Sequence, residues 1–97
     1  MIAKVHIIEG RKMVAVCDKD LLGKKFEEDE MQIDLTGEFY KGEEVSDEEL
    51  AKMLDGAFIA DFVGKKSVEF GESKGLIKKE GIVSVSEIPH AQAFSLS

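Results

Sequence analysis

A capped helix that leads into a buried strand is the feature that most constrains the fold of this chain. In the segment SDEEL, Ser46 occupies the N-cap position and Glu49 the third helical position, which is the spacing of a capping box. Apolar residues follow at helical spacing, at positions 50, 53, 54 and 57. The next segment, FIADFVG (58–64), is too densely apolar for a one-faced helix and predicts a short buried strand. A helix between strands is a crossover, and crossovers permit parallel strand pairs.

The N-terminal residues predict an antiparallel hairpin. Ala3–Ile8 and Lys12–Cys17 are rich in β-branched residues, and Gly10–Arg11 between them suits a type II′ turn. This turn would pair Glu9 with Lys12, Ile7 with Val14, and Val5 with Val16. Both faces of the hairpin would then be fairly apolar, so we expect helices or a second subunit to cover each of them. A homodimer is therefore one predicted assembly.

The remaining segments complete an α+β pattern. In chain order they predict a turn or short helical piece at Asp18–Lys25, a strand at Met31–Leu35, a loop at Thr36–Glu44, a helix at Lys65–Lys74 and a strand at Ile82–Val85. Gly75 suits the C-cap of the second helix. The last strand continues towards Ile88, and Pro89 is expected to end its pairing. The predicted order is β-β-β-α-β-α-β, a mixed sheet packed by two helices in a single domain spanning residues 1–97.

Charge and cysteine content indicate which partners and which cellular compartment to expect for this protein. The net charge is −7, and residues 27–50 hold eleven acidic side chains against one lysine, a net charge of −10. Such a segment repels a phosphate backbone and is more often a solvated face than a site for a metal or a basic partner. Cys17 is the single cysteine, so no internal disulfide forms and a reducing cytoplasm is the expected compartment. The charged start does not resemble a signal peptide, and no apolar run approaches the ~18 residues of a membrane span, so we expect no membrane association.

A family resemblance rests on five phrases in order: VAVCDKDLLGK (14–24), EFYKGE (38–43), DFVGKKSV (61–68), KGLI (74–77) and IPHAQ (88–92). Together they resemble an uncharacterised archaeal family, domain of unknown function 424, over nearly the whole chain. The resemblance is strongest at Cys17–Asp18, Gly64 and Pro89–Gln92. It implies a similar size and a cytoplasmic location, and it brings no assigned activity or catalytic residue. An asparagine is usual in the family where Asp61 stands here, so a ligand-binding role that needs that amide is in question.

The C-terminal segment holds the first candidate binding residues. After Pro89, His90 and Gln92 would project to the same side of an extended chain, with Ala91 opposite. Both side chains donate and accept hydrogen bonds, so they could read a base edge or a carboxylate. The other interpretation is architectural, because small alanines beside both residues also suit a tail packed against the sheet.

Cys17 and Asp18 are the second candidates. Cys17 shares a predicted hairpin face with His6, and a pocket could bring His90 and Asp18 to the thiol. Such a pocket could hold a nucleophile or a small ligand. Zinc needs three or four ligands, and no CxxC or HxxxH spacing occurs, so we expect no metal and no cofactor. A lone cysteine is more often a small, inert core residue.

Gly64, Lys65 and Lys66 begin the second predicted helix in the segment VGKKS. This segment is not a phosphate loop, because position 59 is Ile and Lys66 stands where Ser or Thr is needed. Two lysines at a helix start oppose the helix dipole, so a bound anion or an acidic side chain from elsewhere in the fold is expected there. The lysine doublets at 24–25, 65–66 and 78–79 would form an RNA-binding patch if the fold gathered them, whereas dispersed lysines are the default.

The sequence specifies no substrate and no reaction, so it assigns no function and leaves open whether the protein is an enzyme. The interpretation it favours is a small cytoplasmic, non-enzymatic binding module that takes part in protein- or RNA-linked assemblies. Its surface would lie near Gly64 and His90. The alternative is a small-ligand-binding protein or an enzyme with a pocket around Cys17, Asp18 and His90.

Overall fold

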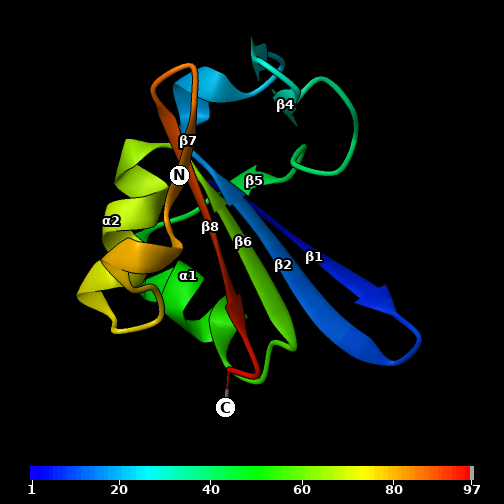
Figure 1. Ribbon diagram of the computed structural model, residues 1–97. Coiled ribbons are helices and arrows are strands. Elements are labelled where there is room, and N and C mark those ends of the chain that lie inside the picture. Colours follow the sequence, from blue (N-terminus) through cyan, green and yellow to red (C-terminus); the bar gives the residue numbers. More distant parts are fainter. Residues whose placement is uncertain (97) are drawn as a thin grey trace.

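The structure, a computed structural model, describes residues 1–96 and forms an α+β fold (Figure 1). The elements are β1 (Ile2–Ile8), β2 (Arg11–Cys17), the 3₁₀ helix η1 (Lys19–Leu21), β3 (Lys25–Glu28), β4 (Met31–Asp34), β5 (Glu43–Glu44), α1 (Asp47–Leu54), β6 (Ile59–Val63), α2 (Lys65–Ser73), the 3₁₀ helix η2 (Lys79–Gly81), β7 (Val83–Val85) and β8 (Ile88–Phe94). Neither α1 nor α2 has the length and apolar character needed to cross a bilayer.

The main sheet is mixed, as the crossover predicted. Its six strands lie in the order β5-β1-β2-β6-β8-β7, and β3 pairs with β4 in a separate sheet. β2 and β6, which α1 connects, are parallel, whereas the other neighbours are antiparallel. The fold class is therefore confirmed, while β3, β5 and the division of the last strand into β7 and β8 were not predicted. The strand β3 (KFEE) escaped prediction because it carries one apolar residue among charged ones.

Each face of the main sheet has its own core. Figure 1 shows α1 and α2 on one side of the sheet, where they pack on Val14, Val16 and Phe62. We call the opposite side the helix-free face; Cys17 and Val63 lie on it beside Leu21 and Leu35. The small β3–β4 sheet lies at one end of the long strands, away from the β1–β2 turn (Figure 1). Only part of the helix-free face is therefore covered.

The capping box of α1 is confirmed. The Ser46 hydroxyl accepts a hydrogen bond from the Glu49 backbone N–H at 3.1 Å. The Glu49 carboxylate accepts one from the Ser46 N–H at 2.9 Å, which lowers the pKa of Glu49. The start of this helix is thus determined by residues adjacent in sequence.

The predicted hairpin register is wrong, because the turn lies one residue earlier in the chain than predicted. The two turn residues are Glu9 and Gly10, with φ of 51° and 77°, so Ile8 pairs with Arg11 and Val5 with Val14. Positive φ at both positions is typical of a type I′ turn, whose twist matches that of the strands it joins. The shift moves each partner by two residues, so the predicted division of side chains between the two faces survives.

Pro89 does not end the last strand; it lies inside β8. The Gly64 N–H donates to the Pro89 carbonyl at 2.9 Å. The Gly64 carbonyl, which an N–H at position 89 would have met, accepts instead from Val68 in the first turn of α2 at 2.9 Å. Proline is therefore tolerated at this position, because the carbonyl that would accept from an N–H there is already hydrogen-bonded within α2.

Gly75 and Gly71 fit the end of α2. Gly75 has φ of 73° and donates to the Glu72 carbonyl, while Leu76 donates to Gly71, which together make the predicted Schellman cap. Gly71 lies within the helix because a Cβ there would meet the Ile77 side chain at 2.3 Å. The glycine allows the chain after the helix to pack closely against it.

Candidate functional site

The candidate site is built around Asp61, a buried carboxylate at the centre of the helix-free face. Strand register places Asp61 of β6 between Ala15 of β2 and Gln92 of β8. In the next rung, Val63 lies between Cys17 and His90. Because residues directly opposite in a sheet share a face, Asp61 and His90 project on the same side. The C-terminal segment thus lies across the sheet and reaches its centre.

Asp61 has two side-chain partners. It is 3% exposed; the Tyr40 hydroxyl donates to Oδ2, and His90 Nε2 lies 2.6 Å from Oδ1. A carboxylate only accepts hydrogen bonds, so the Nε2 nitrogen carries the proton. No lysine or arginine within the described chain pairs with Asp61. The charge of this carboxylate is therefore compensated by an imidazole, which is a titratable group.

His90 lies at the boundary between the protein interior and solvent. Its side chain is 33% exposed, whereas that of Asp61 is 5% exposed. The hydrogen bond to Asp61 raises the pKa of His90, and the charge of Asp61 adds to that effect against the opposing influence of burial. With Nε2 turned inward, Nδ1 is the nitrogen that remains for a further partner. Asp61 thus orients the ring and favours its cationic form, in which Nδ1 also carries a proton and can donate a hydrogen bond.

Tyr40 links this pair to the first strand. Its hydroxyl is held by Asp61, and burial raises the pKa of the phenol well above its usual range, with Asp61 adding to the effect. Its ring lies edge-on to Phe39 at 5.0 Å, and Phe39 stacks on His6 at 4.7 Å. His6 Nε2 is hydrogen-bonded to the Phe39 carbonyl at 2.9 Å. We call the five residues His6, Phe39, Tyr40, Asp61 and His90 the cross-sheet band.

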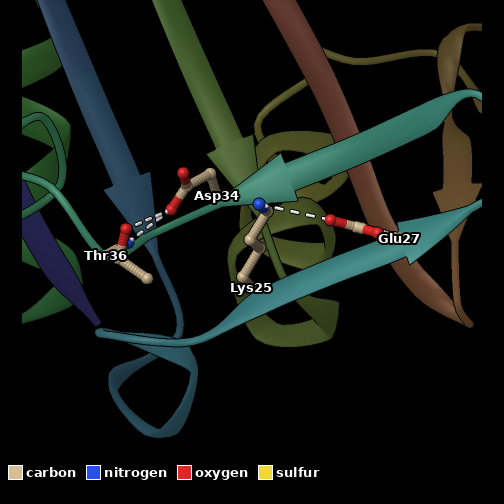
Figure 2. Close-up of polar contacts among 4 residues, drawn as sticks. All are labelled: Lys25, Glu27, Asp34 and Thr36. Carbon is tan, nitrogen blue, oxygen red and sulfur yellow. Dashed lines mark hydrogen bonds and ion pairs between the residues drawn. The ribbon is translucent and has the colours of Figure 1, made fainter.

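The β3–β4 sheet closes the end of the helix-free face beyond the band. Figure 2 shows the contacts that stiffen it: Lys25 pairs with Glu27 at 3.2 Å, and Asp34 accepts from the backbone and hydroxyl of Thr36. The hydroxyl of Thr36 lowers the pKa of the exposed Asp34, and its backbone N–H adds to the effect. Ser86 in the β7–β8 turn donates to Glu28 at 2.7 Å, which ties the two sheets together.

On the other side of the band the helix-free face is uncovered. We call this region the open surface; it consists of Ile8, Met13, Ile59, Gln92 and Phe94. Ile8 and Phe94 are 54% and 60% exposed. Strand register places Met13, Ile59 and Phe94 in one row, directly beside the row that holds Gln92. Met13 and Ile59 are half-buried, and an apolar patch that reaches solvent in this way is typical of a binding surface.

Asp18 and Gly64 are close together, but as part of the architecture. The Asp18 carboxylate accepts from the backbone N–H groups of Lys66 and Ser67 at 3.1 and 2.8 Å, and from the Ser67 hydroxyl at 2.8 Å. A Cβ on Gly64 would lie 2.4 Å from the Asp18 Cγ. The start of α2 is therefore occupied by an acidic side chain from the end of β2, one of the two outcomes expected for VGKKS.

Cys17 does not share a pocket with Asp18 and His90. It is 0% exposed, and burial raises the pKa of its thiol to about 11, with the charge of Asp18 adding to the effect. Val63 stands between it and His90 in the sheet, while Asp18 is turned towards α2. Within residues 1–96, no three His, Cys, Asp or Glu side chains are grouped as metal ligands.

The lysine doublets are dispersed. Lys65 and Lys66 begin α2, Lys78 and Lys79 follow its other end, and Lys25 is paired with Glu27. A depression of about 750 Å³ beside α2 mixes lysines with Asp18, Asp20 and Glu44. The structure therefore does not assemble the three doublets into one basic patch.

Two central members of the band, Tyr40 and Asp61, were not predicted as site residues. The signal available for Asp61 was an acidic residue inside the apolar run FIADFV, which requires a buried partner. No comparable signal marked Tyr40, because its contact with Asp61 spans 21 residues of sequence.

The fold and the band define a class: a small α+β protein with helices on one sheet face and a buried aspartate–histidine pair on the other. A family model described as protein of unknown function (DUF424) matches residues 6–96, and the chain belongs to this family. It is similar in structure to an uncharacterized conserved protein from Methanopyrus kandleri, with a TM-score of 0.76 and 20% sequence identity over 98% of this chain and 90% of that one. At that identity the likeness shows the fold alone. No match was found among curated proteins.

Proposed function

We propose that this protein is a non-enzymatic module that binds a protein segment on its helix-free face. The segment presents a carboxylate to His90 and Gln92, and apolar side chains to the open surface. The single observation that carries this proposal is the contact between buried Asp61 and His90. Burying a carboxylate costs free energy, and here the buried carboxylate holds one imidazole in place at the surface. Perturbed pairs of this kind cluster at functional sites.

The shape of the surface supports a macromolecular ligand. The best-formed depressions on the described chain are lined by residues other than Tyr40, Asp61 and His90. One of them, lined by Ile8, Met13 and Ile59 of the open surface, has a volume of only about 170 Å³. Small molecules are usually held in concave sites that enclose most of their surface. An exposed sheet with an apolar row and two polar side chains is better suited to an extended peptide or a protein surface.

The charge of the surface supports an acidic segment. Along β1, β2, β6 and β8, the residues that face this side include Lys4, Arg11 and His90, and the acidic one is the buried Asp61. A protonated His90 and the Gln92 amide both donate hydrogen bonds, and such bonds to a charged acceptor are the stronger kind. RNA is the less favoured ligand because the lysine doublets are dispersed and form no single basic patch for a phosphate backbone.

The enzymatic alternative has one observation in its favour. A histidine oriented by a buried aspartate is the arrangement of a general base. What it lacks is a nucleophile, because the Cys17 thiol is sealed and its pKa is raised to about 11. We therefore rank binding above catalysis. The single buried thiol also supports a reducing, cytoplasmic setting, and we propose that residues 1–97 act as one domain.

Selection of phage-displayed random peptides on the full-length protein tests this function. Enriched peptides are expected to carry Asp or Glu among apolar residues. His90→Ala should weaken their binding by roughly tenfold or more, because a hydrogen bond to a charged group is lost. Lys52→Ala, an exposed change on α1, serves as the matched control and should bind like the parent. Equal binding to both variants, or enrichment of no peptide while an oligouridylate binds, would overturn the proposal.

A further inference from the structure

The outer edge of β1 is an unpaired strand edge. β5 pairs with it at Ile2 and Ala3, and Gly42 lies against Lys4, which leaves Val5–Ile8 without a strand neighbour on that side among residues 1–96. Ile8 flanks the two-residue turn and pairs with Arg11, so its backbone groups face β2. By alternation, the backbone N–H and C=O groups of Val5 and Ile7 point away from β2. Within the described chain they have no hydrogen-bond partner.

Proline and bulges, two devices that block strand pairing, do not occur at this edge. Each residue of Val5–Ile8 is paired in register with β2. The neighbouring Lys4 is turned to the helix-free face, where its Nζ donates to the Glu38 carbonyl at 3.0 Å. The two residues with outward backbone groups are aliphatic, and Val5 and Ile7 are 39% and 66% exposed. Natural proteins usually block such an edge, so an open one indicates a partner strand.

A depression beside the edge has an apolar wall and a charged rim formed by Lys4, Lys41, Glu43 and Glu49. It has a volume of about 470 Å³ and opens between β1, the segment before α1 and α1 itself. Val5, Val45 and Met53 contribute its apolar wall. It lies on the helix side of the sheet, the side to which the side chains of Val5 and Ile7 project.

We propose that a second copy of this chain pairs with the β1 edge in an antiparallel, two-fold symmetric arrangement centred on His6. In this register Val5 of each copy lies opposite Ile7 of the other, and the outward N–H and C=O groups of both residues form hydrogen bonds across the interface. Each copy places its Ile7 at the mouth of the other copy's depression. Each copy therefore supplies both an inserted side chain and a depression that receives one.

The length of the free edge selects this register. Val5–Ile8 is bounded by Gly42, which lies against Lys4, and by the turn at Glu9, and the proposed pairing is confined to Val5, His6 and Ile7 of each copy. A symmetric pairing centred nearer Ala3 would collide with β5. The charges around the edge are mixed, because the hairpin carries Lys4, Arg11 and Lys12, while Glu43 of β5 and Glu49 of α1 line the depression beside it. No single sign of charge therefore dominates where the two copies meet.

A symmetric crosslink tests the register. The two His6 residues face each other as a non-hydrogen-bonded pair, a geometry with Cα atoms about 4.5 Å apart that a disulfide can span. His6→Cys should therefore form an intermolecular disulfide under mild oxidation, since the natural Cys17 is buried. Ser73→Cys, exposed at the end of α2, is the matched control and should stay monomeric. Equal crosslinking of the two variants would overturn the proposal.

Sedimentation equilibrium tests the interface without a crosslink. The parent should show a monomer–dimer equilibrium, and Ile7→Lys should raise its dissociation constant by roughly tenfold or more, because a charge replaces the buried aliphatic group. Phe94→Lys is the matched control, an equally exposed apolar residue on β8, and should leave the equilibrium unchanged. A parent that remains monomeric at the highest attainable concentration, or a dimer that Ile7→Lys leaves intact, would contradict the proposal. Far-UV circular dichroism of each variant verifies folding.

Discussion

Asp18 and Asp61 are two buried carboxylates with opposite surroundings. Asp18 is 6% exposed and is held by two backbone N–H groups and the Ser67 hydroxyl. Asp61 is 3% exposed and is held by a phenol and an imidazole. The donors around Asp18 do not titrate near neutral pH, whereas one donor around Asp61 does and also reaches solvent. The first arrangement serves the fold, and the second can respond to a ligand.

The largest effect is expected from Asp18→Ala. It removes all three hydrogen bonds to a charged group and leaves the first turn of α2 without compensation for its dipole. We expect the free energy of unfolding to fall by about 3 kcal/mol or more, measured by urea denaturation. Asp20→Ala, an exposed neighbour, is the control and should change little. A loss for Asp18→Ala as small as the control's would mean that Asp18 is not a structural cap.

Gly64→Ala should come next. Gly64 has φ of 107°, and a Cβ there would lie 2.4 Å from the Asp18 Cγ. Both the backbone strain and the displaced carboxylate should lower the free energy of unfolding, together by about 2–3 kcal/mol. At Gly81 a Cβ would meet nothing within 4 Å, so Gly81→Ala should be nearly neutral. Equal stability of the two variants would remove the steric link between Gly64 and Asp18.

Tyr40→Phe should have a smaller effect on stability. It deletes one hydroxyl and leaves Asp61 with His90 as its remaining side-chain partner. We expect a loss of about 1–2 kcal/mol in the free energy of unfolding, again by urea denaturation. The matched control is Thr36→Val, which deletes an exposed hydroxyl bound to Asp34 (Figure 2) and should cost less than about 0.5 kcal/mol. If the two variants cost the same, the Tyr40 contact does not support the buried carboxylate.

How much of this could be predicted from sequence depends on the range of each interaction. The α1 cap and the Schellman end of α2 were predictable because their donors and acceptors lie within a few residues of one another. The Asp18 cap spans 49 residues and the Asp61–His90 contact spans 29, and no local pattern encodes either. Pro89 was wrongly predicted to end its strand for the same reason, because a proline is tolerated there only when the Gly64 carbonyl is hydrogen-bonded within α2.

The predicted site residues divide into those that solvent can reach and those that the core encloses. His90 and Gln92 were singled out by their side-chain chemistry and lie where a ligand can reach them. Gln92 is directly opposite Asp61, and His90 is in the next row on the same face. Cys17 and Asp18 were also singled out by their side-chain chemistry, and Gly64 by the helix start that it precedes, but their contacts belong to the core. Side-chain chemistry identifies candidate groups, while burial decides which of them solvent can reach.

The central claim is that Asp61 orients His90 and favours its protonated form. Because the folded-state pKa of His90 is raised, the pair stabilises the fold at pH values below the ordinary histidine pKa. That contribution is lost as the pH rises through the folded-state value, so the parent should lose stability there more steeply than Asp61→Asn.

The most direct test is an NMR titration of His90 in the parent and in Asp61→Asn, which keeps the shape of the side chain. The account predicts a pKa above 6.5 in the parent and a lower value in the variant. A parent value at or below 6.5, or the same value in both proteins, would contradict it.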